Sequence, residues 1–464
     1  MTLAVMTGGI PLDKKNSMKN SNRLTVLVML TGFFISCQAQ KNRKQAGTEQ
    51  NPEQKLNSKE IKLLIDNLSN ALDRLYIYPD KAILMSKSIK QKLKNGDYNK
   101  IGSRQEVGFQ LHNDLQQAHR DGHLGLRYNP QLAAYLSKPM SDDEKLQQRV
   151  QDLNAARESN FAFKKTELLF GNIGYIRWDE FVGCVEEAQP TLNAAFQFVS
   201  NCKALIIDMR YNGGGSPEMV LRTQNYFFNQ KTHMNDIINR SNDTLKRYTD
   251  PAKTDFKLNM PVYILTSRLT FSGAEDFTYG LKHAKRATIV GETTGGGAHP
   301  TGSYDMGQGF VANIPIARAP VEADWEGIGV LPDVSIPSEQ AFTKARILIS
   351  TELLSRAKDE REKNMFQWNL NNIRSETTKM PDSVVLNSYT GVYEGGLDFH
   401  IKDNQLFCMN AERGNVLFEL RYIDSNLFVL DENVQVHFEK DATGTYTHLK
   451  MLWKNGAVTE KLKM

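Results

Sequence analysis

The segment that most constrains the fold is residues 261–300, which read PVYILTSRLTFSGAEDFTYGLKHAKRATIVGETTGGGAHP. It holds an apolar run at 262–265, a polar break, a helical run that opens at Ser272-Gly273, and a second apolar run at 287–290. Short apolar runs separated by a helix are typical of buried strands in an α/β sheet. A serine at such a strand-to-helix turn exposes its hydroxyl beside the free N–H groups of a helix N-terminus. Serine is also a common helix N-cap, so this segment alone does not identify a nucleophile.

A second segment, residues 204–216 (ALIIDMRYNGGGS), pairs an apolar strand with three consecutive glycines. Glycine tolerates backbone conformations that turn several N–H groups into one cavity. The segment therefore predicts either a tight loop of an α/β sheet or an oxyanion hole beside the serine.

Four motifs in order, IIDMRYNGGG, LTSRLTFSGAEDF, IVGETTGGGAHP and WEGIGVLPD, resemble the C-terminal processing peptidases, also called tail-specific proteases. Their relatives include the tricorn core protease and interphotoreceptor retinoid-binding protein. The resemblance covers roughly residues 55–337. It implies a core with the ClpP/crotonase-like spiral, serine acyl-enzyme chemistry on peptides or proteins, and no metal or organic cofactor. Only 46 residues separate His123 from Phe170. An inserted PDZ domain needs about twice that length, so the chain is similar to the branch without one.

A serine hydroxyl needs an adjacent base to become a nucleophile. The tail-specific branch uses a lysine about 25 residues after the serine, but no lysine lies between Arg286 and Thr343. The tricorn-like branch uses a histidine and a glutamate, and the matching positions are His123 in DGHLGL and Glu326 in WEGIGVLPD. His299 lies close to the position of the missing lysine and is the alternative base.

The resemblance implies that the N–H groups of Gly214 and Gly273 form the oxyanion hole, with Gly213 or Gly215 as alternatives to the first. Glu275 and Asp276 follow the serine on the helix, and we expect them to cap the helix or form ion pairs. The sequence thus predicts a serine endopeptidase in which a histidine replaces the family's lysine. The alternative is a non-catalytic lipid- or peptide-binding protein on the same scaffold, and a third hypothesis is an esterase with the same nucleophile.

The N-terminus predicts export. Lys19 and Arg23 precede a 12-residue apolar run at 24–35, which fits the hydrophobic region of a signal peptide. Ile35-Ser36-Cys37 resembles a lipobox, so we expect a lipid anchor at Cys37 and a protein that faces the periplasm; the alternative is cleavage after Ala39 and a periplasmic or secreted protein. The net charge of +4 comes from the first 50 residues, which hold seven Lys/Arg and two Asp/Glu, so the charge does not indicate a nucleic-acid partner.

The sequence predicts a multidomain α/β protein with an N-terminal helical bundle and a C-terminal antiparallel β-domain. No spacing of the four cysteines suggests a metal site, and we expect Cys184 and Cys202 to be buried thiols. The expected parts are a leader at 1–40, a tether at 41–57, a three-helix domain at 58–127, an α/β peptidase core at 128–358, a charged connector at 359–383 and an all-β domain at 384–464.

Overall fold

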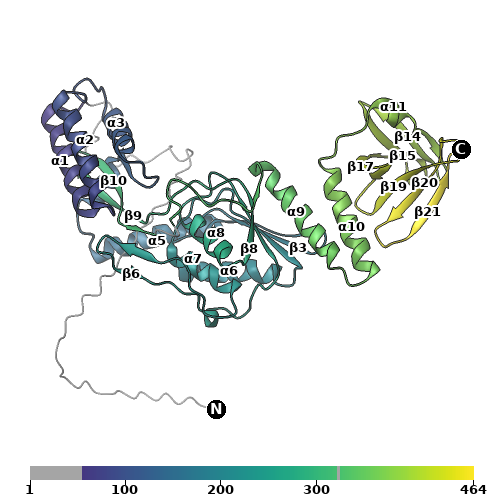
Figure 1. Cartoon of the computed structure of the whole chain (residues 1–464), viewed down its shortest axis with the longest axis horizontal. Helices are drawn as coiled ribbons and strands as arrows, with labels where there is room; N and C mark the ends of the chain where they lie inside the picture. The colour runs from purple at the N-terminus through teal and green to yellow at the C-terminus, as the bar shows by residue number, and fades with distance from the viewer. Residues whose placement is uncertain (1–54, 321–323) are drawn as a thin grey trace, which may run out of the picture.

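The structure is a computed structural model that describes residues 55–320 and 324–464. The expected leader, Cys37 and most of the expected tether lie outside the described residues. Helices lie at one end of the molecule, an α/β sheet in the middle and antiparallel sheets at the other end (Figure 1). Among the described residues, no helix has the length and apolar character needed to span a membrane.

The N-terminal helices share their core with a hairpin from much later in the chain. The helices are α1 (Ser58–Leu75), α2 (Pro79–Asn95) and α3 (Arg104–Ala118), and α1 and α3 begin at capping boxes. Their apolar faces pack on a three-stranded sheet of β1 (Gly125–Tyr128), β10 (Phe310–Pro315) and β9 (Thr301–Gly307). The region expected as an independent domain at 58–127 is therefore completed by residues 301–315.

The central sheet has six strands in the order β12-β8-β7-β4-β3-β2. The three apolar runs of the sequence are confirmed as β4 (Ala204–Asp208), β7 (Val262–Thr266) and β8 (Ala287–Gly291). These strands are parallel to one another, as are β3 and β12, and only β2 is antiparallel to its neighbour. The remaining bounds are β2 (Phe163–Leu169), β3 (Ile173–Trp178) and β12 (Val334–Ser335).

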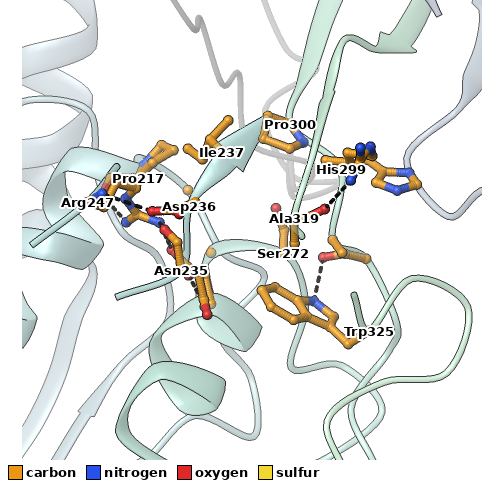
Figure 2. Close-up of a pocket in the computed structure, with 16 residues that line it drawn as sticks. Pro217, Asn235, Asp236, Ile237, Arg247, Ser272, His299, Pro300, Ala319 and Trp325 are labelled. Atoms are coloured by element: carbon orange, nitrogen blue, oxygen red, sulfur yellow. Dashed lines mark hydrogen bonds and ion pairs between the residues drawn. The ribbon is translucent and has the colours of Figure 1, made fainter. Parts of the chain in front are cut away.

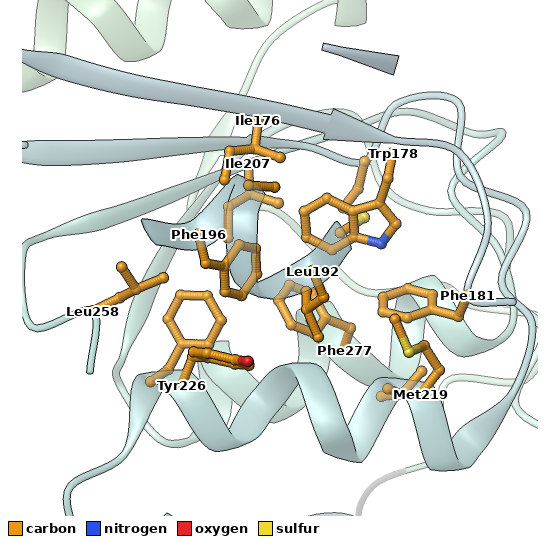
Figure 3. Packing of buried hydrophobic residues seen from close by; sticks show 14 of the residues in the cluster. Ile176, Trp178, Phe181, Leu192, Phe196, Ile207, Met219, Tyr226, Leu258 and Phe277 are labelled. Carbon is orange, nitrogen blue, oxygen red and sulfur yellow. The ribbon is translucent and has the colours of Figure 1, made fainter. Parts of the chain in front are cut away.

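Helices cover both faces of this sheet, which explains why its strands read as continuous apolar runs. On one face, side chains from α6 (Val185–Val199), α7 (Pro217–Gln224) and α8 (Gly273–His283) form an aromatic-rich core with β3, β4 and β7 (Figure 3). On the other face, α9 (Ser338–Ser355) packs on β7 and β8. The span between β1 and β2, where a PDZ domain would be inserted, forms α4 (Pro130–Leu136), α5 (Asp142–Glu158) and the 3₁₀ turn η1 (Asn160–Ala162).

Residues 359–383 differ from the expected charged connector, because most of them form the helix α10 (Glu360–Ser375). Phe366, Leu370 and Ile373 recur at helical spacing and are buried, while charged residues occupy the first turn. The charged first turn hid this apolar stripe. The helix packs on α9 and on the C-terminal strands at Arg421–Asp424 and Leu427–Val429, so it is part of the folded structure.

The C-terminal region consists of a short helix, α11 (Ser383–Asn387), and two antiparallel sheets, β13-β14-β15-β16 and β17-β18-β19-β20-β21. Residues 416–424 form two strands in different sheets, separated by the buried Leu420. The bounds are β13 (Gly391–Tyr393), β14 (Leu397–Lys402), β15 (Gln405–Asn410), β16 (Val416–Glu419), β17 (Arg421–Asp424), β18 (Leu427–Val429), β19 (Val434–Lys440), β20 (Tyr446–Trp453) and β21 (Val458–Leu462). Cys184, Cys202 and Cys408 are free thiols.

Candidate active site

The parallel order of the central sheet brings the glycine turn next to Ser272. The turn follows β4 and Ser272 follows β7, and these two strands are parallel neighbours, so both segments leave the same edge of the sheet. The contact is close: a Cβ placed on Gly214 would lie 2.8 Å from Cβ of Ser272 and 2.6 Å from the backbone nitrogen of Gly273. Only glycine fits between the strand ends and the start of α8.

Ser272 has a backbone conformation that non-glycine residues rarely adopt, with φ 53° and ψ −120°. Such a conformation costs on the order of 1–3 kcal/mol and persists only where the surroundings impose it. Here the N–H of Ser272 donates to Oε2 of Glu275 at 2.9 Å, and the carbonyl accepts from the N–H groups of Glu275 and Asp276. In this conformation Ser272 lies at the N-terminus of α8 and at the edge of a cleft (Figure 2).

Glu275 is a buried anchor rather than a solvated carboxylate. Besides the N–H of Ser272, it accepts the hydroxyl of Thr294 and the N–H groups of Gly296 and Gly297, the last two at 2.8 and 2.7 Å. Burial raises the pKa of Glu275 to about 7, against the opposing effect of these hydrogen bonds. The next residue of the helix, Asp276, forms a 2.7 Å ion pair with Arg247. The expectation that both residues cap or pair is confirmed.

The three glycines of the turn differ in what their N–H groups do. Gly213 donates to the carbonyl of Asp179 at 3.3 Å, and Gly214 donates to Oδ1 of Asn212 at 2.9 Å. Within residues 55–320 and 324–464, the N–H groups of Gly215 and Gly273 have no acceptor. A Cβ on Gly273 would lie 3.1 Å from the nitrogen of Gly215, so these two groups are neighbours. The geometry thus leaves Gly215, the open alternative to Gly214, with an available donor.

His123 lies against Phe271, the residue before Ser272, with ring centroids 4.6 Å apart. Its side chain is 10% exposed, and its Nδ1 is buried without a hydrogen-bond partner among the described residues. Oε2 of Glu326 lies 3.9 Å from this Nδ1, which is longer than a hydrogen bond. Glu326 is held by the N–H groups of Gly122 at 2.7 Å and Ala298 at 2.6 Å. The structure therefore places a carboxylate beside the buried nitrogen of His123.

The three-stranded sheet β1-β10-β9 brings the two candidate histidines together although 175 residues separate them in sequence. His123 lies two residues before β1, and His299 lies two residues before β9. Both strands pair with β10, so that Gly125 and Ser303 lie on either side of Asn313. The starts of β1 and β9 therefore lie at the same end of this sheet.

His299 has a different environment from His123. It is 2% exposed, and its Nδ1 lies 2.8 Å from Oδ2 of Asp121. Its Nε2 lies 3.3 Å from the hydroxyl of Tyr78 and 3.8 Å from Asp324. Burial alone would lower the pKa of His299, but hydrogen bonds and the charges of Asp121, Asp324 and Glu326 raise it to about 10. His299 is therefore an imidazolium at neutral pH and has no free site for a further proton.

The cleft beside Ser272 has an empty volume of about 500 Å³, counted with the space that opens to solvent. Its walls come from α7, α8, the β8–β9 loop and the segment 229–259 (Figure 2). Within that segment, β5 (Ile237–Asn239) pairs with β6 (Thr244–Leu245) and with β11 (Ala317–Arg318). The side chains that line the cleft include Asn235, Asp236, Ile237, Arg247, Ala319 and Trp325.

Sequence reasoning missed two groups near the site. Asp121 precedes His123 by two residues and accepts its N–H at 2.9 Å, a short-range pattern that an aspartate in this position favours. Arg247 in the cleft wall had no recognisable signal, because its ion pair with Asp276 spans 29 residues. The guanidinium of Arg210, in the glycine-turn motif, binds Asp208 and the carbonyl of Ser338, which ties β4 to α9.

Comparison with known proteins matches the two regions of the chain that contribute residues to this candidate site. Residues 172–336 match the model of peptidase family S41, and residues 56–162 match the N-terminal domain that this family has in eukaryotic IRBP. The carboxyl-terminal-processing peptidase 2 of Arabidopsis thaliana chloroplasts is 26% identical over 181 residues, which are 37% of this chain and 34% of the relative. The chloroplastic C-terminal processing peptidase of Tetradesmus obliquus is also 26% identical over 181 residues, 36% of each chain.

The chain thus spans about a third of the length of the curated relatives it matches. Among solved structures, the tricorn protease aligns with a TM-score of 0.42 at 15% identity, over 65% of this chain and 37% of that one.

Proposed function

The chain carries the core and N-terminal domains of peptidase family S41, and from this premise we propose that it is a serine endopeptidase that cleaves flexible peptides or proteins. The observation that carries the proposal is the strained Ser272 at the start of α8, beside two N–H groups without acceptors on Gly215 and Gly273. Backbone strain of this kind accumulates at functional sites. A binding protein on the same scaffold would have no need of it.

In the proposed mechanism, Oγ of Ser272 attacks the carbonyl carbon of the scissile peptide while His123 accepts the hydroxyl proton. The negative charge that develops on the carbonyl oxygen is held by the N–H groups of Gly273 and Gly215, the latter in place of Gly214. The intermediate collapses as His123 returns the proton to the leaving amine, which gives an acyl-enzyme on Ser272. A water molecule, deprotonated by His123, then releases the second product and restores the serine.

Glu326 is assigned as the partner of His123. Its Oε2 lies 3.9 Å from Nδ1 of His123, and a carboxylate there stabilises the imidazolium that forms during acyl transfer. Catalytic hydrogen bonds are often long in structures without substrate and shorten in the complex. The buried Nδ1 has no other partner among the described residues, which favours this pairing.

His299 is the weaker candidate for the base, although it lines the cleft. Its Nδ1 is engaged by Asp121 and its raised pKa keeps it protonated at neutral pH. A base must be unprotonated to accept the serine proton. The assignment of His123 therefore rests on the environments of the two rings.

The proposed site of action is the cell envelope. The apolar run at 24–35 and the lipobox-like Cys37 support export and lipid attachment. Replacement of Cys37 by serine should abolish incorporation of labelled palmitate and release the protein from the membrane fraction, whereas Cys408→Ser, which changes a buried thiol, should leave both unchanged.

Hydrolysis of casein by the full chain tests the proposed chemistry. We expect Ser272→Ala and His123→Ala to abolish hydrolysis, and a serine-directed phosphonate to label wild type but not Ser272→Ala. His112→Ala is the matched control, because His112 lies on α3 outside the cleft. A wild type that neither hydrolyses casein nor reacts with the phosphonate would contradict the proposal and favour the binding-protein hypothesis. Hydrolysis of esters but not of peptides would favour an esterase.

A further inference from the structure

A buried polar cluster lies beside His123, and Glu326 is its one member with a part in the proposed mechanism. His299 is at its centre, and among the described residues the charged or titratable side chains that interact with it or with its carboxylate partners come from three separate segments. These are the loop after α1 and the turn after α3 in the N-terminal part, and the loop after β11. The side chains are Tyr76, Tyr78, His119, Asp121, Asp324 and Glu326.

Asp121 connects His299 to the backbone of His123. Its Oδ1 accepts the N–H groups of His123 at 2.9 Å and Leu124 at 3.3 Å. Its Oδ2 accepts the hydroxyl of Tyr76 at 2.7 Å and lies 2.8 Å from Nδ1 of His299. One oxygen of the carboxylate therefore fixes the turn that carries His123, and the other is fixed by His299.

Glu326 connects His299 to the side chain of His123. Its Oε2 lies 3.5 Å from Nδ1 of His299 and 3.9 Å from Nδ1 of His123. Its Oε1 accepts the N–H of Gly122, in the same turn. Both carboxylates that hold the His123 turn thus face the same imidazole ring. Without a cation between them, two largely buried negative charges would repel each other and the turn would lose its fixed position.

We propose that His299 is a positioning residue: as a buried cation it holds Asp121 and Glu326 together, and through them it sets the position of His123 beside Ser272. This inference rests on the proposed function. The raised pKa of His299 is consistent with it, because neighbouring carboxylates favour the charged imidazolium. If His299 acts only by holding the two carboxylates, it needs no free nitrogen for the reaction, and this explains why a histidine that lines the cleft can be protonated.

A metal ion is the alternative occupant of this cluster, because ligand atoms of Asp121, His299 and Glu326 all lie within 4.8 Å of one another. A histidine must lose the proton from the nitrogen that binds a metal. Here that nitrogen, Nδ1, is within hydrogen-bond distance of Asp121, whose oxygen also accepts Tyr76. These contacts are satisfied by a proton on His299, which favours the imidazolium over a metal ion.

The test compares wild type with His299→Asn, which keeps an amide donor near Asp121 but removes the charge. We expect kcat to fall by about 100-fold, the loss typical of a catalytic group displaced by about 1 Å, with little change in KM. Adding Asp121→Asn removes the unbalanced negative charge and should recover about tenfold of the lost kcat. His112→Asn, on α3 and away from the cluster, is the matched control and should retain the wild-type kcat.

Nitrogen NMR of the histidine rings in the wild type gives a readout that does not depend on activity or on the folding of a variant. We expect the His299 ring, assigned by its contacts with Tyr78, to stay protonated on both nitrogens up to about pH 8. A neutral ring at pH 7, a stoichiometric metal in the purified protein, or an unchanged kcat in His299→Asn would each overturn the inference. A wild type without Ser272-dependent hydrolysis would overturn the proposed function, and the inference with it.

Discussion

Replacing Gly214 by alanine should reduce catalysis far more than it reduces stability. Gly214 has φ 101°, which costs an L-residue about 1–2 kcal/mol. The added Cβ would lie 2.6 Å from the nitrogen of Gly273, whereas ordinary contacts begin at 3.4 Å. The start of α8 must therefore retreat by about 0.8 Å, and a displacement of about 1 Å at a catalytic group typically costs about 100-fold in rate.

The assay measures kcat for peptide hydrolysis beside the melting temperature. We expect kcat of Gly214→Ala to fall by about 100-fold, and the melting temperature to fall by roughly 2–8 °C for about 1–2 kcal/mol. Gly456→Ala is the matched control: its φ is 89°, but an added Cβ has no atom within 4 Å. It should show a similar fall in melting temperature with unchanged kcat. If Gly214→Ala kept its kcat while losing the same stability as the control, the close fit of the glycine turn to Ser272 would not matter for catalysis.

Three further changes test the anchors of the site. Burial raises the pKa of Glu275 from 4.5 to about 7, so the folded state holds this proton more tightly than the unfolded state does. The free energy of unfolding of the wild type, relative to that of Glu275→Gln, should therefore fall by about 3 kcal/mol between about pH 4 and pH 8. Urea unfolding at several pH values measures this difference, and a difference that does not change with pH would contradict the reasoning. Arg247→Met leaves Asp276 unpaired in a largely buried site and should cost about 3–5 kcal/mol, most of it recovered when Asp276→Asn is added. Phe310→Ala, at a fully buried position of β10, should cost about 3–5 kcal/mol and abolish hydrolysis at a temperature where circular dichroism still shows the central sheet; loss of both signals together would refute this.

The local parts of the site could be predicted because each one has its own sequence pattern. A strand buried on both faces needs an uninterrupted apolar run, as in β4, β7 and β8. A turn whose φ is positive and whose Cβ would collide with a neighbouring backbone needs glycine, as at Gly214 and Gly215. Ser272 was a candidate because it stands between an apolar strand and a helix, in a motif that accompanies the glycine turn.

The sequence could not decide between His123 and His299, since the answer depends on pairing between distant segments. Either ring could have approached Ser272 until β1 and β9 were known to flank β10. The contacts of His299 come from Asp121 and Asp324, which lie far from it in sequence or in a loop without a periodic pattern. The helix α10 was missed for another reason: its charged first turn outweighed a narrow apolar stripe.

The two side chains that we propose to react come from two different hydrophobic cores. Ser272 starts a helix of the central α/β core, whereas His123 lies on a turn of the core that the N-terminal helices form with β9 and β10. Apolar contacts alone are non-directional and would let two such cores shift against each other. Besides the ring contact of His123 with Phe271, the site has hydrogen bonds and ion pairs of fixed geometry, from Asp121 to His299 and from Glu326 to Gly122 and Ala298. Because such a network stabilises only one relative position, it can hold the proposed base and the proposed nucleophile in register across the boundary between two cores.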